Sequence, residues 1–109
     1  MSWIGVDLDG TLAEYHGPSR DGAIGRPVPA MVERVRGWIA EGREVRVVTA
    51  RVSSVIPFRD RERAWGFVVR WCVEHVGFTL AVTAEKDFEL EELWDDRAVR
   101  VETNTGRLL

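Results

Sequence analysis

Short apolar runs alternate with amphipathic segments along this chain. Strands are predicted at five apolar runs, over residues 3–8, 45–49, 78–82, 93–95 and 99–101. The first run ends in acidic residues and a glycine, which is typical of a buried parallel strand. Apolar residues recur at helical spacing over 28–39 and 65–76, and each pattern stops at a glycine, Gly42 or Gly77. The pattern therefore predicts strands and helices in alternation.

Strands that alternate with helices of this length favour right-handed βαβ units. We therefore predict an α/β fold, with a three-layer, doubly wound, Rossmann-like parallel sheet of about five strands. Residues 13–27 contain glycines, two prolines and mixed charges without a helical or strand period, which indicates a loop or small flap. Because the chain has 109 residues and shows no linker or repeat, we expect a single domain over residues 1–109.

The composition narrows the classes of partner. A formal net charge of −3 provides no broad electrostatic surface for nucleic acids or anionic membranes. Cys72 is the single cysteine, which rules out an intrachain disulfide and disfavours a cysteine-based metal site. The first residues lack the basic and apolar regions of a signal peptide, and no apolar run has the length needed to span a membrane. These features are consistent with a cytoplasmic protein, and we expect no membrane partner.

Acidic residues gather where the predicted strands end. In a doubly wound sheet, ligands bind beyond the carboxyl ends of the strands. Asp7 and Asp9 end the first run, and a turn at Gly10 allows both to enter one crevice. Asp95 and Asp96 stand at the end of the fourth run. Like charges about 4 Å apart repel by roughly 4 kcal/mol per pair at an effective dielectric constant of about 20, so such a cluster needs a cation. Hard oxygen ligands suit Mg²⁺.

Two further strand ends carry groups suited to phosphate. Thr49 closes the second strand and offers a hydroxyl, with the backbone N–H groups of Ala50 and Arg51 beside it. Lys86 follows the third strand and offers a cation for phosphoryl oxygens. Carboxylates, a metal, a hydroxyl and a lysine together indicate phosphoryl transfer.

Each of these signals alone has an ordinary explanation. Asp9-Gly10 and Asp95-Asp96 are common turn sequences. A lone strand-end threonine is most often structural, and a lone lysine is most often solvated. A calcium loop is disfavoured because Thr11 stands where its next acidic or Asn ligand belongs. Their joint placement at four successive strand ends is what favours a functional site.

The same residues form an ordered set of motifs. Residues 7–12 read Asp-Leu-Asp-Gly-Thr-Leu after an apolar strand, and residues 47–51 close a second strand with a threonine. Residues 83–87 carry a lysine, and residues 95–97 read Asp-Asp-Arg. In this order the set resembles the haloacid dehalogenase (HAD) superfamily over nearly the whole chain. The acidic motif is similar to that of the polynucleotide 3′-phosphatases in this superfamily.

The resemblance implies a Mg²⁺-dependent phosphatase that works in two steps. Asp7 attacks phosphorus to form an aspartyl-phosphate, and Asp9 protonates the leaving oxygen before it activates water. Mg²⁺ is held by Asp7, the backbone carbonyl of Asp9 and the acidic pair, with Asp96 favoured over Asp95 as the direct ligand. The catalytic set is completed by Thr49 and Lys86, which stabilise charge on the transferred group.

The chain also departs from the larger members of the family it resembles. Those members carry a cap domain over the substrate, whereas residues 13–27 are too few to form one. We therefore expect a capless enzyme with an open site, or a site closed by a neighbouring subunit of a homo-oligomer. The substrate stays open at this point between a small phosphorylated metabolite, a nucleotide and a nucleic-acid 3′ end.

Two other functions are compatible with this fold. One is a catalytically weak HAD-like protein that binds or regulates. The other is a receiver-type signalling domain, which accepts a phosphoryl group on an aspartate at the end of its third strand. That strand end reads Val82-Thr83-Ala84 here, so the receiver reading is disfavoured.

Overall fold

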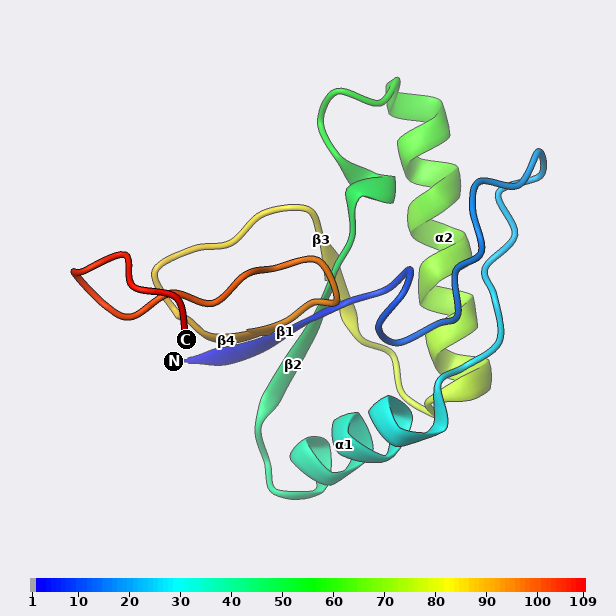
Figure 1. The fold of residues 1–109 in the computed structure, drawn as a ribbon. Helices are drawn as coiled ribbons and strands as arrows, with labels where there is room; N and C mark the ends of the chain where they lie inside the picture. Colours follow the sequence, from blue (N-terminus) through cyan, green and yellow to red (C-terminus); the bar gives the residue numbers. More distant parts are fainter. Residues whose placement is uncertain (1) are drawn as a thin grey trace.

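The computed structural model describes residues 2–109 as four strands, two α-helices and one short 3₁₀ helix (Figure 1). In chain order these are β1 (Trp3–Asp7), α1 (Pro29–Ala40), β2 (Glu44–Val48), η1 (Ala50–Val52), α2 (Phe58–His75), β3 (Ala81–Thr83) and β4 (Leu90–Trp94). The prediction of an α/β fold with a parallel sheet is confirmed. Within the described residues, no helix has both the length and the apolar composition required to cross a membrane.

The order of the strands places the carboxyl end of β1 at a change of direction. The sheet has the order β3-β2-β1-β4, and every neighbouring pair is parallel. The chain runs from β1 to β2 to β3 and then crosses to β4, on the other side of β1. In sheets of this kind, ligands bind in the crevice where the strand order reverses. That crevice lies here between the ends of β1 and β4.

Both helices lie on one face of the sheet, so the predicted three-layer arrangement is wrong. The connections β1–α1–β2 and β2–α2–β3 advance in the same direction, and right-handed crossovers therefore place both helices on the same side. The core contains the inward side chains of both central strands together with those of both helices: Ile4, Val6, Val45, Val47, Met31, Val32, Val35, Val68, Trp71 and Cys72. The return connection over residues 84–89 covers the opposite face without a helix.

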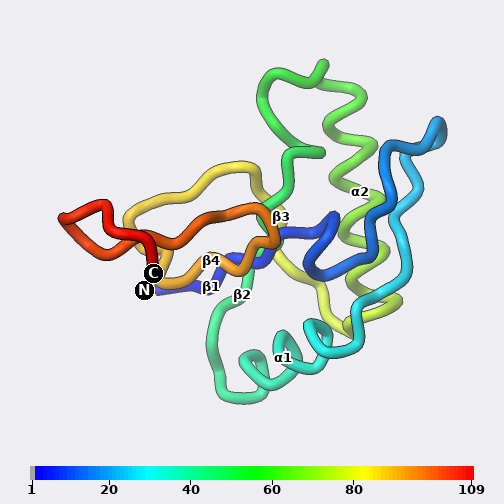
Figure 2. Tube along the Cα trace, viewed as in Figure 1, coloured from blue at the N-terminus to red at the C-terminus, as the bar shows by residue number. Residues whose placement is uncertain are grey.

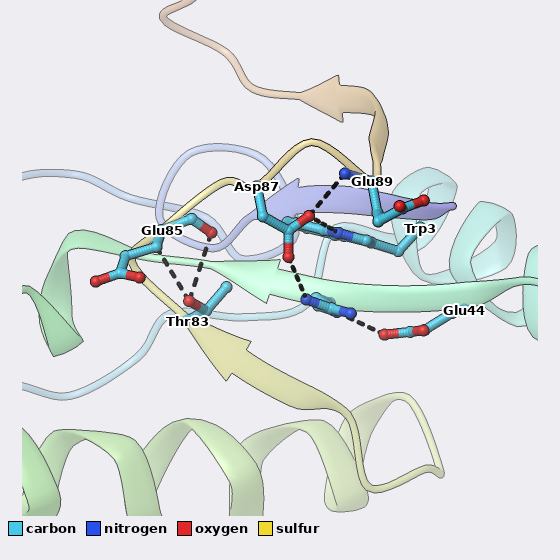
Figure 3. A network of polar contacts seen from close by, with 7 residues as sticks. Trp3, Glu44, Thr83, Glu85, Asp87 and Glu89 are labelled. Carbon is cyan, nitrogen blue, oxygen red and sulfur yellow. Dashed lines mark hydrogen bonds and ion pairs between the residues drawn. The ribbon is translucent and has the colours of Figure 1, made fainter. Parts of the chain in front are cut away.

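Polar contacts hold this helix-free connection against the sheet. The indole N–H of Trp3 donates to Oδ1 of Asp87 at 2.8 Å, and the backbone N–H of Glu89 donates to the same oxygen at 2.9 Å. Arg46 donates to Oδ2 of Asp87 at 3.4 Å, and its guanidinium lies 4.3 Å from the centre of the Trp3 ring. Figure 3 shows Asp87 beside Trp3, and because side chains alternate along β1, Trp3 lies on the opposite face of the sheet from the core residue Ile4. The loop replaces the missing helix layer through these contacts.

The sheet has four strands, so the prediction of a fifth strand over residues 99–101 is wrong. Val101 forms an isolated antiparallel bridge with Leu108 instead. The turn between them contains Asn104 and Gly106 at φ 70° and 75°, a left-handed backbone that these residue types adopt readily. The segment therefore pairs with the end of its own chain, which Figure 2 shows as a loop on the side of the sheet away from α2.

The helix α2 has one apolar stripe, and the stripe is buried along only part of the helix. Val68 and Cys72 are fully buried, whereas Trp65, which the helical pattern places on the same face, is 50% exposed. The helix begins at Phe58, directly after Pro57. Trp65 lies near Val82 and Thr83, at the carboxyl end of β3. The first turns of α2 therefore extend beyond the sheet, and no part of residues 2–109 covers Trp65 as the core covers Val68.

Candidate functional site

A pocket of about 480 Å³ lies at the carboxyl ends of the strands. All four strand ends contribute to its wall. The wall includes six of the predicted site residues with charged or hydroxyl side chains: Asp7, Asp9, Thr49, Arg51, Asp95 and Asp96. Ala50 lines it as well, together with Tyr15 from the flap. The structure thus gathers in one pocket groups that are up to 89 positions apart in the sequence, from Asp7 to Asp96.

Three carboxylates form an acidic cluster in this pocket. One oxygen each from Asp7, Asp95 and Asp96 lies within 4.8 Å of the others. The pKa of Asp7 is raised from 3.8 to about 7. Burial is the largest cause, and the negative charge of Asp95 and a hydrogen bond with Asp96 act in the same direction. The crowding therefore favours a proton or a cation at Asp7.

A threonine of the first motif holds Asp96 in the acidic cluster. The hydroxyl of Thr11 donates to Oδ1 of Asp96 at 2.9 Å and accepts the backbone N–H of Asp96 at 3.0 Å. The first of these bonds is the main reason why the pKa of Asp96 is lowered. From the sequence, Thr11 is predicted to belong to the motif over residues 7–12 but not to the site itself. Its place in the D-x-D-G-T string was the available signal for this contact.

The turn after β1 brings the backbone close to the same carboxylate. Gly10 has φ +92°, and a Cβ atom built on it would lie 2.5 Å from Oδ2 of Asp96. Backbone N–H groups of Leu12 and Ala13 close the turn by donating to the carbonyl of Leu8 at 3.0 and 2.9 Å. Position 10 therefore requires glycine for two separate reasons, its backbone angle and its distance from Asp96.

Asp9 lies in the pocket but stands outside the acidic cluster. Arg51 donates to both oxygens of its carboxylate, from Nε at 2.7 Å and from a terminal nitrogen at 2.9 Å. The same guanidinium donates to the carbonyl oxygens of Gly22 and Ala23 in the flap, at 2.6 and 3.3 Å. Arg51 thus joins Asp9 to the flap, and its own pKa is raised chiefly by the bond with Asp9.

Thr49 positions this arginine. Its side chain is almost fully buried, and its hydroxyl oxygen accepts the backbone N–H of Arg51 at 3.2 Å, which caps the 3₁₀ helix η1. The backbone N–H of Thr49 donates to the carbonyl of Thr83, so the neighbouring strand β3 fixes its place. Thr49 therefore shapes the pocket through its hydroxyl and through the 3₁₀ helix η1 that it caps.

Lys86 is exposed and is not part of the pocket wall. It precedes Asp87, which Trp3 binds on the face of the sheet away from the helices. Arg97 lines the pocket instead, and its positive charge contributes to the lowered pKa of Asp96. The cationic side chains in the pocket wall are thus Arg51 and Arg97. Within the described residues, no contact of Lys86 supports the phosphate-binding role predicted for it.

The fold is similar to that of a conserved protein from Bacteroides thetaiotaomicron. That solved structure superimposes with a TM-score of 0.58 at 22% sequence identity, over 88% of this chain and 76% of the other. At this identity the similarity shows the fold alone. No family model matches this chain. No curated protein matches it either.

Proposed function

We propose that this chain is a Mg²⁺-dependent phosphatase of the HAD type that acts through an aspartyl-phosphate on Asp7. The observation that carries the proposal is the acidic cluster at the reversal of the strand order, in which the pKa of Asp7 is raised to about 7. Carboxylates with shifted pKa values in a pocket are typical of catalytic sites. The adjacent arginines supply the positive charge that a phosphate group requires.

The donors of the acidic cluster fit Mg²⁺. Asp7, Asp95 and Asp96 offer only hard oxygen ligands, and the pocket is wide enough to leave further positions for water and phosphate. When bound, the metal neutralises the cluster and withdraws charge from the phosphoryl oxygens. Thr11 restrains Asp96 through two hydrogen bonds, and partners of this kind orient metal ligands.

The residues of the chain account for both chemical steps. A carboxylate oxygen of Asp7 attacks phosphorus, and the bond from phosphorus to the leaving oxygen breaks while Asp9 gives that oxygen a proton. Asp9 then takes a proton from water, the water oxygen attacks phosphorus, and phosphate leaves with Asp7 restored. Arg51 binds both oxygens of Asp9 in this structure, so it must turn away before Asp9 can transfer a proton. The released guanidinium is then available to phosphate.

A second candidate is a HAD-like protein that binds phosphorylated molecules without efficient turnover. The pairing of Asp9 with Arg51 and the exposed position of Lys86 favour it, because both remove groups from the expected catalytic set. A receiver-type domain has less support, since β3 ends at Thr83 and its last residues include no aspartate. The two leading candidates differ in turnover, which can be measured.

The test is hydrolysis of an aryl phosphate with Mg²⁺ and with a chelator. We expect turnover that requires Mg²⁺ and falls by at least about a thousandfold in Asp7→Asn, as is usual when a covalent nucleophile is removed. Asp60→Asn, an exposed change in the first turn of α2, is the matched control and should retain activity. A fully active Asp7→Asn protein would refute the nucleophile, and phosphate binding without turnover in the unaltered chain would favour the second candidate.

A further inference from the structure

A second pocket of about 360 Å³ adjoins the acidic one. It lies between η1 and its following loop, the first turns of α2 and the carboxyl end of β3. Ser53 and Ala84 belong to the walls of both pockets. A molecule with its phosphate beside Asp7 can therefore extend past these two residues into the second pocket, which we call the side pocket.

The side pocket contains an aromatic surface that the core does not use. Trp65 lines it and is 50% exposed, although it continues the stripe that is buried at Val68. Arg61, one helical turn earlier on the same face, also lines the pocket, and its guanidinium lies 5.5 Å from the centre of the Phe58 ring. A half-exposed indole in a concave wall is a surface on which a planar aromatic group can stack.

The polar groups around Trp65 restrict what that planar group can be. Glu62 and Glu85 offer only hydrogen-bond acceptors, whereas Ser53 and Ser54 offer both donors and acceptors. A ring with amino groups on its edge matches this wall. The two carboxylates also outnumber the single arginine of the side pocket, so the further phosphates of a polynucleotide would meet repulsion there.

We propose that the side pocket binds the base of a mononucleotide, with Trp65 stacking on the base and the phosphate lying beside Asp7. This inference rests on the proposed function, because it uses the acidic pocket as the phosphate site. It names a substrate class, the nucleoside monophosphates with an amino-bearing base, and it makes Trp65 a residue that determines specificity. It disfavours a nucleic-acid 3′ end.

The kinetic test compares AMP with glycerol 2-phosphate, which has no aromatic group. Trp65→Ala should lower the ratio of kcat/KM for AMP to that for glycerol 2-phosphate by roughly 5- to 100-fold, the loss expected for one stacked base. Trp65→Phe should restore part of the ratio. Phe78→Ala is the matched control, since Phe78 is 45% exposed and belongs to neither pocket. An unchanged ratio in Trp65→Ala would overturn the proposal.

Two further substrate pairs test the edge chemistry. CMP should be preferred over UMP, because cytosine has an amino group at the position where uracil has a carbonyl oxygen, and that oxygen would be repelled by the carboxylates of Glu62 and Glu85. AMP should also be preferred over a 3′-phosphorylated oligonucleotide. The opposite preference in either pair would overturn the corresponding part of the proposal.

A binding measurement separates this inference from the proposed function. The indole N–H signal of Trp65, assigned by its loss in Trp65→Phe, is followed by NMR while AMP is added to the full chain in the presence of Mg²⁺. A chain that hydrolyses no phosphate ester but shifts this signal supports the side pocket and contradicts the phosphatase. Hydrolysis of glycerol 2-phosphate with an unmoved Trp65 signal supports the phosphatase and contradicts the side pocket.

Discussion

At the level of single residues, the acidic cluster depends on neighbours that carry no charge. Thr11 donates one hydrogen bond to Asp96 and accepts another from it, and the absence of a side chain at Gly10 leaves room for the Asp96 carboxylate. The carboxylates themselves could be predicted from the sequence because acidic residues follow β1 and β4. The pairing of Asp9 with Arg51 could not, since it depends on a contact between residues 42 positions apart.

Replacing Gly10 should damage the cluster more than it damages the fold. Gly10→Ala forces an L-residue into a left-handed backbone, which costs about 1–2 kcal/mol, and its Cβ must displace Asp96. We expect Mg²⁺ affinity to fall roughly 10- to 100-fold, the usual effect of disturbing the support of a metal ligand. Isothermal titration calorimetry measures this affinity.

The control separates backbone strain from the displaced carboxylate. Gly42 has a similar φ of +82°, but a Cβ atom there would meet nothing within 4 Å. Gly42→Ala should therefore lose a comparable amount of stability and keep its Mg²⁺ affinity. Equal affinities in the two variants would contradict the role given to Gly10.

The raised pKa of Asp7 predicts how stability depends on pH in the metal-free protein. Between pH 3.8 and about 7 the unfolded chain has released the Asp7 proton while the folded chain retains it. The folded state therefore binds more protons, and this group lowers the free energy of unfolding as the pH rises through that range. Above about pH 7 both states have released the proton, and the contribution of Asp7 to the free energy of unfolding no longer changes with pH.

Asp7→Asn should remove this contribution. The free energy of unfolding of the variant minus that of the unaltered chain, measured by urea denaturation in chelator, should increase from pH 3.8 to about 7 and then level off. Taking the difference cancels the other titrating groups. A difference that does not change with pH would show that the environment of Asp7 does not raise its pKa.

At the level of elements, local patterns predicted which segments are helical better than they predicted what those helices cover. The helix α1 agrees with the pattern at both ends, with Pro29 in its first turn and Gly42 after it. The apolar stripe of α2 was also visible in the sequence. The sequence does not show that the N-terminal part of α2 extends beyond the sheet and leaves Trp65 half exposed. This exposure depends on where β3 ends.

The β3–β4 connection should depend on Asp87. Asp87→Ala removes the acceptor of the Trp3 indole N–H and a partner of Arg46, so it should lower the free energy of unfolding more than a neighbouring exposed change does. Hydrogen exchange at the backbone N–H of Glu89 should also become faster. Phe88→Ala, a fully exposed neighbour, should change stability by less than about 0.5 kcal/mol. Equal stabilities for the two variants would contradict the anchoring role of Asp87.

At the level of the whole molecule, one reversal of strand order determines both the site and the missing layer. Right-handed crossovers place α1 and α2 on the same face, and the return to β4 is too short to add a helix on the other. The sequence predicted the parallel sheet and the acidic residues at its carboxyl edge. It could not predict four strands in place of five, because the apolar run at 99–101 pairs locally with the chain end. A homo-oligomer that covers the pocket stays a prediction.

The most direct measurement asks whether Asp7 becomes phosphorylated. A turnover mixture is quenched in acid, reduced with borohydride and digested, and the peptides are analysed by mass spectrometry, since reduction converts an aspartyl-phosphate into homoserine. With Mg²⁺ and substrate present, we predict homoserine at position 7, and none in chelator or in Asp7→Asn. Phosphate release without modification of Asp7, or with modification of another carboxylate, would contradict the proposed mechanism.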